Sequence, residues 1–179
     1  MDLDIVDDDG NSVRGKNGYL VIKSPWPAMT RGLLNDDDRY IETYWSRFEK
    51  IWFHGDYVFA DEDNLWYMRG RSDDVINVSG HRMSTAEIEH AVISHKKISD
   101  AASISIPDEL TGEAIVVCFV SNDKNDIDLE SEIMEHISKK IGKIAKPKIL
   151  FQLSDLPKTR TGKIMRRLLK AKLTGNPLG

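Results

Sequence analysis

The chain has 179 residues, 40% of them hydrophobic, which is enough to bury one large domain or one domain and part of another. Its net charge of −4 is uneven, because seven basic residues and no acidic residue follow Asp155, leaving −11 on the rest of the chain. A single cysteine, Cys118, excludes an internal disulfide and a thiolate metal cluster. The basic end favours an anionic small ligand or an acidic docking surface. It lacks the interleaved aromatic residues typical of nucleic-acid binding.

The sequence shows no sign of export or of membrane insertion. Residues 1–4 have neither the basic start nor the apolar stretch of a signal peptide. No apolar run reaches the roughly 18 residues that a membrane span requires. Cys118 lies in the apolar run 115–120, which favours a buried thiol. We therefore expect a cytoplasmic protein without membrane or nucleic-acid partners.

The first 70 residues predict mainly strands. These are expected at residues 18–22, 57–60 and 65–68. The acidic stretch 61–64 predicts a hairpin turn between the last two strands, and a short helix is expected within 39–52. Four tryptophans fall between Trp26 and Trp66, and such large rings need burial. They either form a small core among themselves or cover the surface of a further domain.

A polar segment then lies between two regular elements. Val75 to Val78 predict a short strand, which Ser79 and Gly80 end. His81 and Arg82 are expected to lead into a helix over 85–95, and Ser84 to Glu87 form a capping-box sequence at its start.

The rest of the chain predicts further strands and two more helices. The strands are expected at residues 101–106, 114–120 and 147–153, and the helices at 129–141 and from about Lys163. Leu129, Ile133 and Ile137 lie on one face of the first of these helices. The order strand, helix, two strands, helix, strand, helix predicts a compact α+β domain over 74–173.

Two motifs carry a resemblance to a known family. Gly-Arg-Ser-Asp-Asp, followed by Asn-Val-Ser-Gly-His-Arg, occupies residues 70–82, and Pro-Lys-Thr-Arg-Thr-Gly-Lys occupies 157–163. They resemble segments of the acyl-activating, adenylate-forming enzymes, and among these the acetyl-CoA synthetases. Gly-Tyr-Leu-Val-Ile leading to Pro-Trp-Pro, within 18–27, extends the resemblance over nearly the whole chain.

The resemblance implies two domains. Residues 1–72 would be the terminal β-rich segment of the large N-terminal, AMP-binding domain. Residues 73–179 would be the mobile C-terminal lid domain, an α+β fold with a mixed β-sheet flanked by helices. Asp73 would be the hinge about which this lid rotates.

Lys163 is the first candidate for a catalytic residue. A lysine in a polar loop before a helix can bring a mobile positive charge to a phosphate or carboxylate oxygen. From these features alone, a solvated basic helix end remains the alternative. The resemblance implies that Lys163 bridges the carboxylate and the α-phosphate during adenylation.

Further candidates suit a nucleotide and a thiol cofactor. The Asp56 carboxylate can accept hydrogen bonds from ribose hydroxyls, and the Arg71 guanidinium can donate to ribose or phosphate oxygens. The resemblance assigns both residues, with Arg82, to nucleotide binding. It also implies that Ser79 contacts coenzyme A, while Gly80 leaves room for the pantetheine arm.

Two details of the resemblance concern a metal and a phosphate. Ile93, His95 and Ile98 match positions at which relatives hold a structural cation through backbone oxygens. The arginine that binds a coenzyme A phosphate in relatives is replaced by Ser138, with lysines at the next two positions.

The resemblance implies an acetate–CoA ligase that uses ATP, Mg²⁺ and coenzyme A. It would join acetate and ATP into acetyl-adenylate, then transfer the acetyl group to coenzyme A. The family's Ser/Thr/Gly-rich phosphate loop and Tyr-x-x-Thr-Glu segment are absent from the sequence, so we expect a part that needs the N-terminal domain of the same enzyme. The alternatives are a synthetase for another short acid, such as propionate, and a stand-alone nucleotide- or coenzyme-A-binding module.

Overall fold

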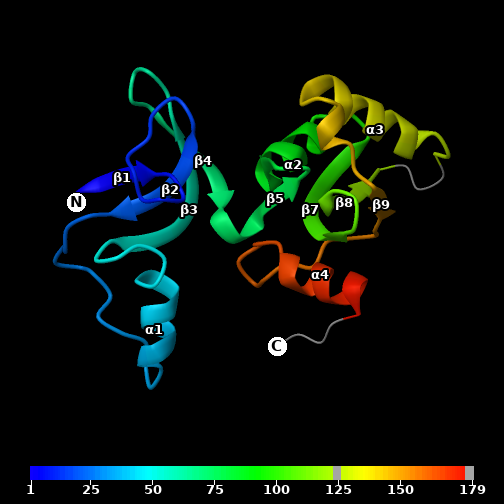
Figure 1. Cartoon of the computed structure of the whole chain (residues 1–179). Coiled ribbons are helices and arrows are strands. Elements are labelled where there is room, and N and C mark those ends of the chain that lie inside the picture. Colours follow the sequence, from blue (N-terminus) through cyan, green and yellow to red (C-terminus); the bar gives the residue numbers. More distant parts are fainter. Residues whose placement is uncertain (123–125, 176–179) are drawn as a thin grey trace. The chain divides into compact units, whose positions relative to one another are not determined.

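The computed structural model describes residues 1–122 and 126–175. It divides into two compact units, Met1–Asp73 and Asp74–Gly179, here called unit 1 and unit 2 (Figure 1). The lid domain expected over 73–179 includes residues 123–125 and 176–179, which lie outside the described residues.

Unit 1 is built on an antiparallel sheet with the strand order β1-β2-β3-β4. Its strands are β1 (Leu3–Val6), β2 (Asn17–Ile22), β3 (Trp52–Ala60) and β4 (Trp66–Arg71). The predicted hairpin joins β3 to β4, and Asp61 Oδ1 accepts the Leu65 N–H at 2.8 Å in its turn. Apolar side chains from β1, β2 and β3 form the core.

Helix α1 (Asp37–Tyr44) is shorter than the segment in which a helix was expected. It ends at Tyr44 because residues 46–51 must return the chain to β3, where Trp52 pairs with Ile22 of β2. The rings of Trp26, Tyr40, Tyr44 and Trp45 contact the buried Trp52 ring. The tryptophans other than Trp66 thus form the small aromatic core that the sequence left as one of two possibilities.

Asp4 gives unit 1 a buried charge. Its side chain accepts hydrogen bonds from Ser12 and from Arg14 Nη1, the latter at 3.0 Å, and pairs with Lys23. Burial by itself would raise the pKa of Asp4, but these partners outweigh it and hold the pKa well below its ordinary value. A carboxylate with a depressed folded-state pKa stabilises the fold above its unfolded pKa, about 3.9. That stabilisation is lost as the pH falls through the folded-state pKa.

Asp4→Asn is therefore expected to lower the free energy of unfolding at pH 7 by about 1–3 kcal/mol, because it removes charged hydrogen bonds. Its effect should shrink as the pH falls toward 2. Urea unfolding followed by tryptophan fluorescence measures this, since all four tryptophans lie in unit 1. Asp63→Asn, in the exposed β3–β4 turn, is the matched control. Equal effects of the two changes at both pH values would contradict the prediction.

Unit 2 is an α+β fold with a mixed sheet, as predicted. Its strand order is β6-β5-β8-β7, antiparallel throughout, and β9 pairs with β8 in parallel. The strands are β5 (Val75–Val78), β6 (His81–Ser84), β7 (Ile98–Asp108), β8 (Gly112–Ser121) and β9 (Ile149–Gln152). The helices are α2 (Thr85–Ile93), α3 (Leu129–Lys140) and α4 (Arg166–Thr174), with short 3₁₀ turns at Ser72–Asp74 and Lys143–Ala145.

Unit 2 has a core on each face of its sheet. Alternate residues of β8 point to opposite faces, so that Val117 and Phe119 join the α2 and α3 side while Val116 and Cys118 join the α4 side. Figure 1 shows α2 and α3 on one face of the sheet and α4 on the other. The predicted apolar face of α3 is buried. Cys118 is buried as expected, and burial raises the pKa of its thiol.

Three local expectations for unit 2 were wrong. Residues 81–84 form strand β6, paired with β5, instead of leading into a helix. Ser84 is the N-cap of α2, but its side chain makes no capping hydrogen bond. Helix α4 begins at Arg166, three residues after Lys163.

No helix among the described residues is long and apolar enough to cross a membrane.

Candidate functional site

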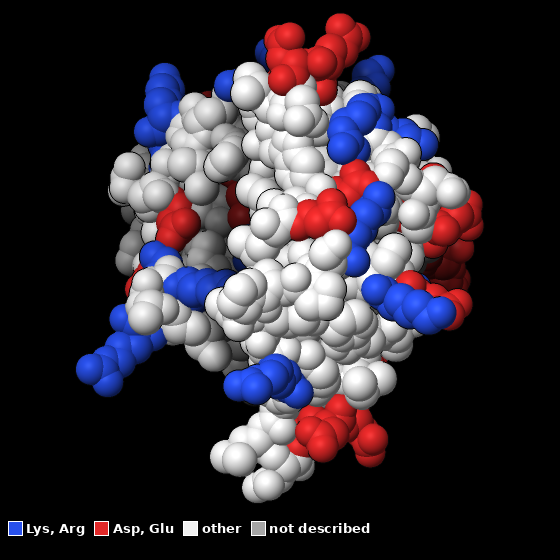
Figure 2. Space-filling model, turned by 90° about the vertical axis from the view of Figure 1, so that its left-hand side faces the viewer, with Lys and Arg blue, Asp and Glu red and all other residues white. Residues whose placement is uncertain are grey.

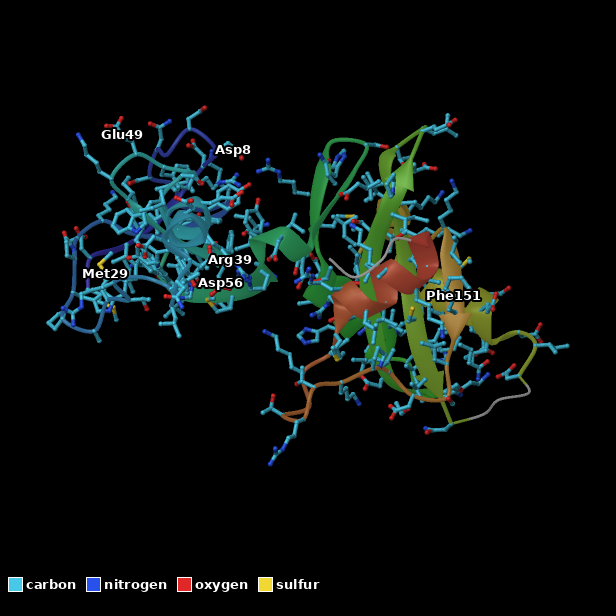
Figure 3. All side chains as sticks on the ribbon, turned by 90° about the horizontal axis from the view of Figure 1, so that it is seen from below. Asp8, Met29, Arg39, Glu49, Asp56 and Phe151 are labelled. Carbon is cyan, nitrogen blue, oxygen red and sulfur yellow. The ribbon has the colours of Figure 1, made fainter. Side chains whose placement is uncertain are left out.

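Asp56 and Arg71 are brought together in unit 1. They face each other across β3 and β4, with Arg71 Nη1 3.5 Å from Asp56 Oδ1. The other Asp56 oxygen lies 2.7 Å from His54 Nδ1. Arg71 Nε also donates to Asp73 Oδ1 at 3.3 Å. Figure 3 labels Asp56 on its strand. A partly exposed carboxylate and guanidinium thus share one edge of the unit, where both can reach a ligand.

Gly55 allows this arrangement. Its φ of +87° favours glycine, and a Cβ there would lie 2.6 Å from Arg71 Nη2. The guanidinium therefore occupies space that a larger residue would fill, and Arg71 Nη1 donates to the His54 carbonyl at 3.4 Å. Ser72 Oγ donates to the Gly55 carbonyl at 3.1 Å and further fixes the segment.

No motif in the sequence singles out His54. It lies two residues before Asp56, and side chains two apart on a strand share a face. That spacing was the available signal. His54 holds Asp56 from the side opposite Arg71, so the carboxylate is oriented by two partners.

Ser79 and Gly80 form the tight turn between β5 and β6. Both have positive φ angles, 51° and 83°, as in the two-residue type I′ turns that match strand twist. Both residues are exposed. A Cβ at Gly80 would meet nothing within 4 Å, so the backbone there is open to a ligand. Arg82 follows on β6, also exposed, opposite Asn77 of β5.

Lys163 is exposed on a loop with its own hydrogen bonds. The Thr159 N–H donates to the Lys163 carbonyl at 2.8 Å, and the Lys163 N–H donates to Thr159 Oγ1 at 3.1 Å. The Met165 N–H closes the loop on the Pro157 carbonyl at 2.8 Å. Figure 3 shows this loop, coloured orange, extending away from the sheet. The backbone at Lys163 is therefore fixed while its side chain can reach outward.

The two lysines of the loop differ. Lys158 Nζ lies 2.6 Å from Asp100 Oδ2 on β7, and this carboxylate raises the pKa of Lys158. Among the ion pairs of residues 1–122 and 126–175, none includes Lys163. Lys158 thus anchors the loop, and Lys163 is the lysine available to a ligand.

Ile93, His95 and Ile98, the residues of the expected cation site, lie between the end of α2 and the start of β7. Ile93 ends α2 and Ile98 begins β7, while the His95 carbonyl accepts the Ile98 N–H at 3.0 Å. The His95 Nδ1 atom is buried without a hydrogen-bond partner in the described structure. No group of three or more His, Cys, Asp or Glu side chains among the described residues could hold a metal. A cation held by the backbone oxygens of Ile93, His95 and Ile98 stays a prediction.

Ser138 lies on α3 beside exposed lysines. Lys139 pairs with Glu135 at 2.7 Å one turn earlier. Lys140 is exposed at the end of the helix. That Lys139 or Lys140 takes the place of the arginine implied by the resemblance stays a prediction.

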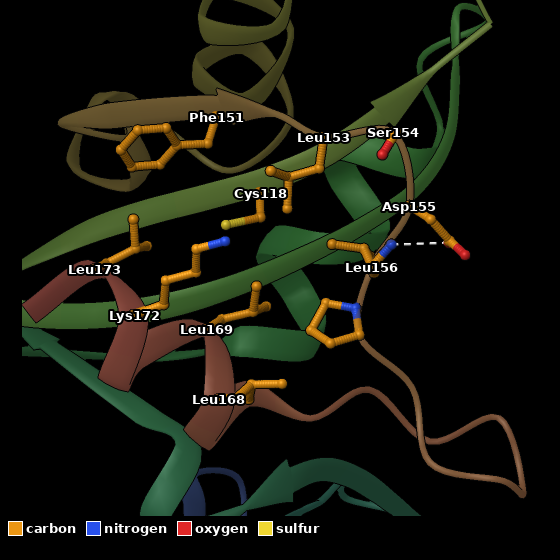
Figure 4. A pocket seen from close by; sticks show the side chains of 11 residues that line it. Cys118, Phe151, Leu153, Ser154, Asp155, Leu156, Leu168, Leu169, Lys172 and Leu173 are labelled. Atoms are coloured by element: carbon orange, nitrogen blue, oxygen red, sulfur yellow. Dashed lines mark hydrogen bonds between the residues drawn. The ribbon is translucent and has the colours of Figure 1, made fainter. Parts of the chain in front are cut away.

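A cavity of about 670 Å³ in unit 2 lies apart from these residues (Figure 4). Leu169, Leu173 and Phe151 line it, together with Cys118 and with Lys172, whose amine points toward Cys118 in Figure 4. None of the predicted site residues contributes to the lining, and its walls are mainly apolar. The polar members of its lining are Ser154, Asp155 and Lys172.

Charge on the surface is mixed where it can be seen. On the face drawn in Figure 2, Lys and Arg side chains are scattered among Asp and Glu side chains without a continuous basic surface. That face lacks the electrostatic footprint of a nucleic-acid-binding protein.

Residues 87–163 match the family described as the AMP-binding enzyme C-terminal domain. The whole chain is 47% identical to acetyl-coenzyme A synthetase of Pyrobaculum arsenaticum and covers 27% of that protein. Against acetyl-coenzyme A synthetase of Streptomyces coelicolor, identity is 47% over 93% of the chain and 26% of the relative. The chain thus spans about a quarter of the length of these curated relatives.

Solved structures share the fold. Acetoacetyl-CoA synthetase from Streptomyces lividans is 27% identical, with a TM-score of 0.87 over 99% of this chain and 27% of its own. The anthranilate CoA ligase AuaEII is 26% identical, with a TM-score of 0.82 over 98% of this chain and 34% of its own. Over its whole length the chain is therefore similar to part of the acetyl-coenzyme A synthetases, and its residues 87–163 match the C-terminal domain of the AMP-binding enzymes.

Proposed function

We propose that the chain is part of an acetate–CoA ligase that forms acetyl-adenylate from acetate and ATP and then acetyl-CoA from acetyl-adenylate and coenzyme A. The observation that carries this is the 47% identity to an acetyl-coenzyme A synthetase over the entire chain. In this proposal, residues 1–72 complete an N-terminal domain and residues 73–179 form the lid.

In the first step, an acetate oxygen attacks the α-phosphorus of ATP and pyrophosphate leaves. Lys163 supplies a positive charge where negative charge gathers on the carboxylate and phosphate oxygens. Asp56, held by His54 and Arg71, accepts hydrogen bonds from the ribose hydroxyls. Arg71 and Arg82 contribute nucleotide contacts.

In the second step, the coenzyme A sulfur attacks the acetyl carbonyl carbon, and AMP leaves. Rotation about Asp73 would replace the Lys163 loop with the Ser79–Gly80 turn at the adenylate. The open backbone of this turn suits a thin pantetheine arm passing close by.

In this proposal, Mg²⁺ would bind together with ATP. The described residues hold no side-chain cluster fit for a metal, so no magnesium ligand is assigned to this chain. The ion would neutralise phosphate charge when ATP binds.

The test is acetate-dependent exchange of labelled pyrophosphate into ATP, together with acetyl-CoA formation, by the full-length protein that contains this sequence. We expect both activities there and neither in residues 1–179 alone. Calorimetry of the chain alone with ATP, AMP and coenzyme A separates this from a binding module. Tight binding by the chain, without activity in any longer form, would overturn the proposal.

A second candidate is a synthetase for another short carboxylic acid. Proteins named for acetoacetate and for anthranilate share this fold over nearly the whole chain, so the fold of this part is compatible with more than one acid. The same exchange assay with propionate and acetoacetate decides between the candidates. A higher kcat/KM for either acid than for acetate would replace acetate in the proposal.

A further inference from the structure

A network of charged side chains joins three segments of unit 2. Arg166, the first residue of α4, makes a forked contact with Glu89 of α2: Arg166 Nη2 lies 2.8 Å from Glu89 Oε2, and Nε lies 3.2 Å from Oε1. Arg166 Nη1 lies 3.5 Å from Asp74 Oδ2. Glu89 Oε1 also accepts the Ser103 N–H of β7 at 2.8 Å. One guanidinium therefore ties α4 to α2 and to the first residue of unit 2.

Helix formation does not explain this network. Helix α4 begins with two arginines and has no acidic residue in its first turn, which its dipole disfavours. Glu89 is only 7% exposed, and burial raises its pKa although Arg166 and Ser103 act in the opposite direction. A buried ion pair is weak evidence for stability, since desolvation offsets much of its attraction. The forked geometry of this pair, by contrast, fixes the position and orientation of the Arg166 side chain relative to Glu89.

The network lies next to the Lys163 loop. Lys163 precedes Arg166 by three residues, and at the other end of the loop Lys158 is paired with Asp100 at 2.6 Å. Between these anchors, the loop is held by the hydrogen bonds of Thr159 with Lys163. The exposed Lys163 thus lies in a loop whose two ends are held by ion pairs, that of Lys158 at one end and those of Arg166 at the other. Preorganised charge is what electrostatic catalysis requires.

We propose that Arg166, held by Glu89 and Asp74, is a positioning residue for Lys163. It makes the lysine loop move as one body with the segment that directly follows the proposed hinge at Asp73. A rotation of the backbone at residue 73 then moves Lys163 to or from the adenylate, because the loop keeps its position relative to the segment that rotates. This inference rests on the proposed function, since it assigns Arg166 a part in the adenylation step only.

The test uses Arg166→Lys and Asp74→Asn in the full-length enzyme. Lysine keeps the charge but loses the fork, and asparagine keeps the shape at a partly exposed position. Lys170→Gln, four residues further along α4 and exposed, is the matched control. We expect both network variants to slow adenylation about tenfold to a hundredfold, as a displacement of roughly 1 Å does. Thioester formation from supplied acetyl-adenylate should stay close to wild type, as should both steps in the control.

NMR relaxation of the Gly162 and Lys163 amides in residues 1–179 measures the mobility of the Lys163 loop. It separates a positioning role of the network from a merely structural one. Increased mobility in both variants, with adenylation alone slowed, supports the inference. Unchanged mobility, or equal loss in both half-reactions, overturns it. If Arg166→Lys unfolds, Asp74→Asn decides on the same criteria. Increased mobility without any loss of adenylation overturns the inference, and a Lys163→Ala enzyme that also adenylates normally would show that the proposed function itself is wrong.

Discussion

Replacing Lys163 with alanine is expected to lower the rate of acetyl-adenylate formation in the full-length enzyme by roughly 10²–10³-fold, the loss typical for one preorganised donor. Thioester formation from supplied acetyl-adenylate should continue at close to the wild-type rate. The reason is positional: Lys163 is exposed on a clamped loop, whereas the residues proposed to meet coenzyme A lie on the β5–β6 turn. Pyrophosphate exchange measures the first step, and acetyl-CoA release from acetyl-adenylate measures the second.

Lys170→Gln controls for the loss of one positive charge from the basic end of the chain. Its amine lies 3.4 Å from Ser105 Oγ, and the residue has no proposed role in either step. Both half-reactions should be unchanged by it. If Lys163→Ala slows the two half-reactions equally, the division of labour between loop and turn is wrong. If it slows neither, Lys163 is merely a solvated residue.

Periodicity was sufficient to predict most of the fold. The apolar run of β8 and the four-residue spacing on α3 identify a buried strand and an amphipathic helix, and the strand and the apolar face of the helix are buried as predicted. Strand β6 was missed because Ser84 to Glu87 also match a capping box. The pairing of β6 with β5 is a tertiary fact that local preference does not contain. In the same way, α1 ends where the chain must turn back to β3.

For the candidate site, the motifs located residues but not their partners. Asp56 and Arg71 are close because of the β3–β4 register and its shift between Tyr57 and Val58. The predicted strands, 57–60 and 65–68, did not reach either residue. Glu89 and Arg166 are 77 positions apart, so no local pattern links them. The start of α4 was also misplaced, since Lys163 belongs to a loop closed by Thr159 and not to the helix.

Gly80→Leu is expected to have the opposite effect to Lys163→Ala. In the full-length enzyme this substitution should lower the rate of thioester formation by roughly 10²-fold or more, because the leucine side chain fills the space proposed for the pantetheine arm. Adenylate formation should be retained. The substitution also strains the backbone, since Gly80 has a φ of +83°, at a cost of about 1–2 kcal/mol. A stability loss of that size leaves most domains folded.

Gly80→Ala separates strain from obstruction. Alanine bears the same backbone strain, but its Cβ would meet nothing within 4 Å. Thermal unfolding should therefore shift equally in the two variants, while thioester formation falls steeply only in Gly80→Leu. Equal losses in both would indicate that the conformation of the Ser79–Gly80 turn matters and not the space beside it. Normal thioester formation in Gly80→Leu would remove this turn from the path of coenzyme A.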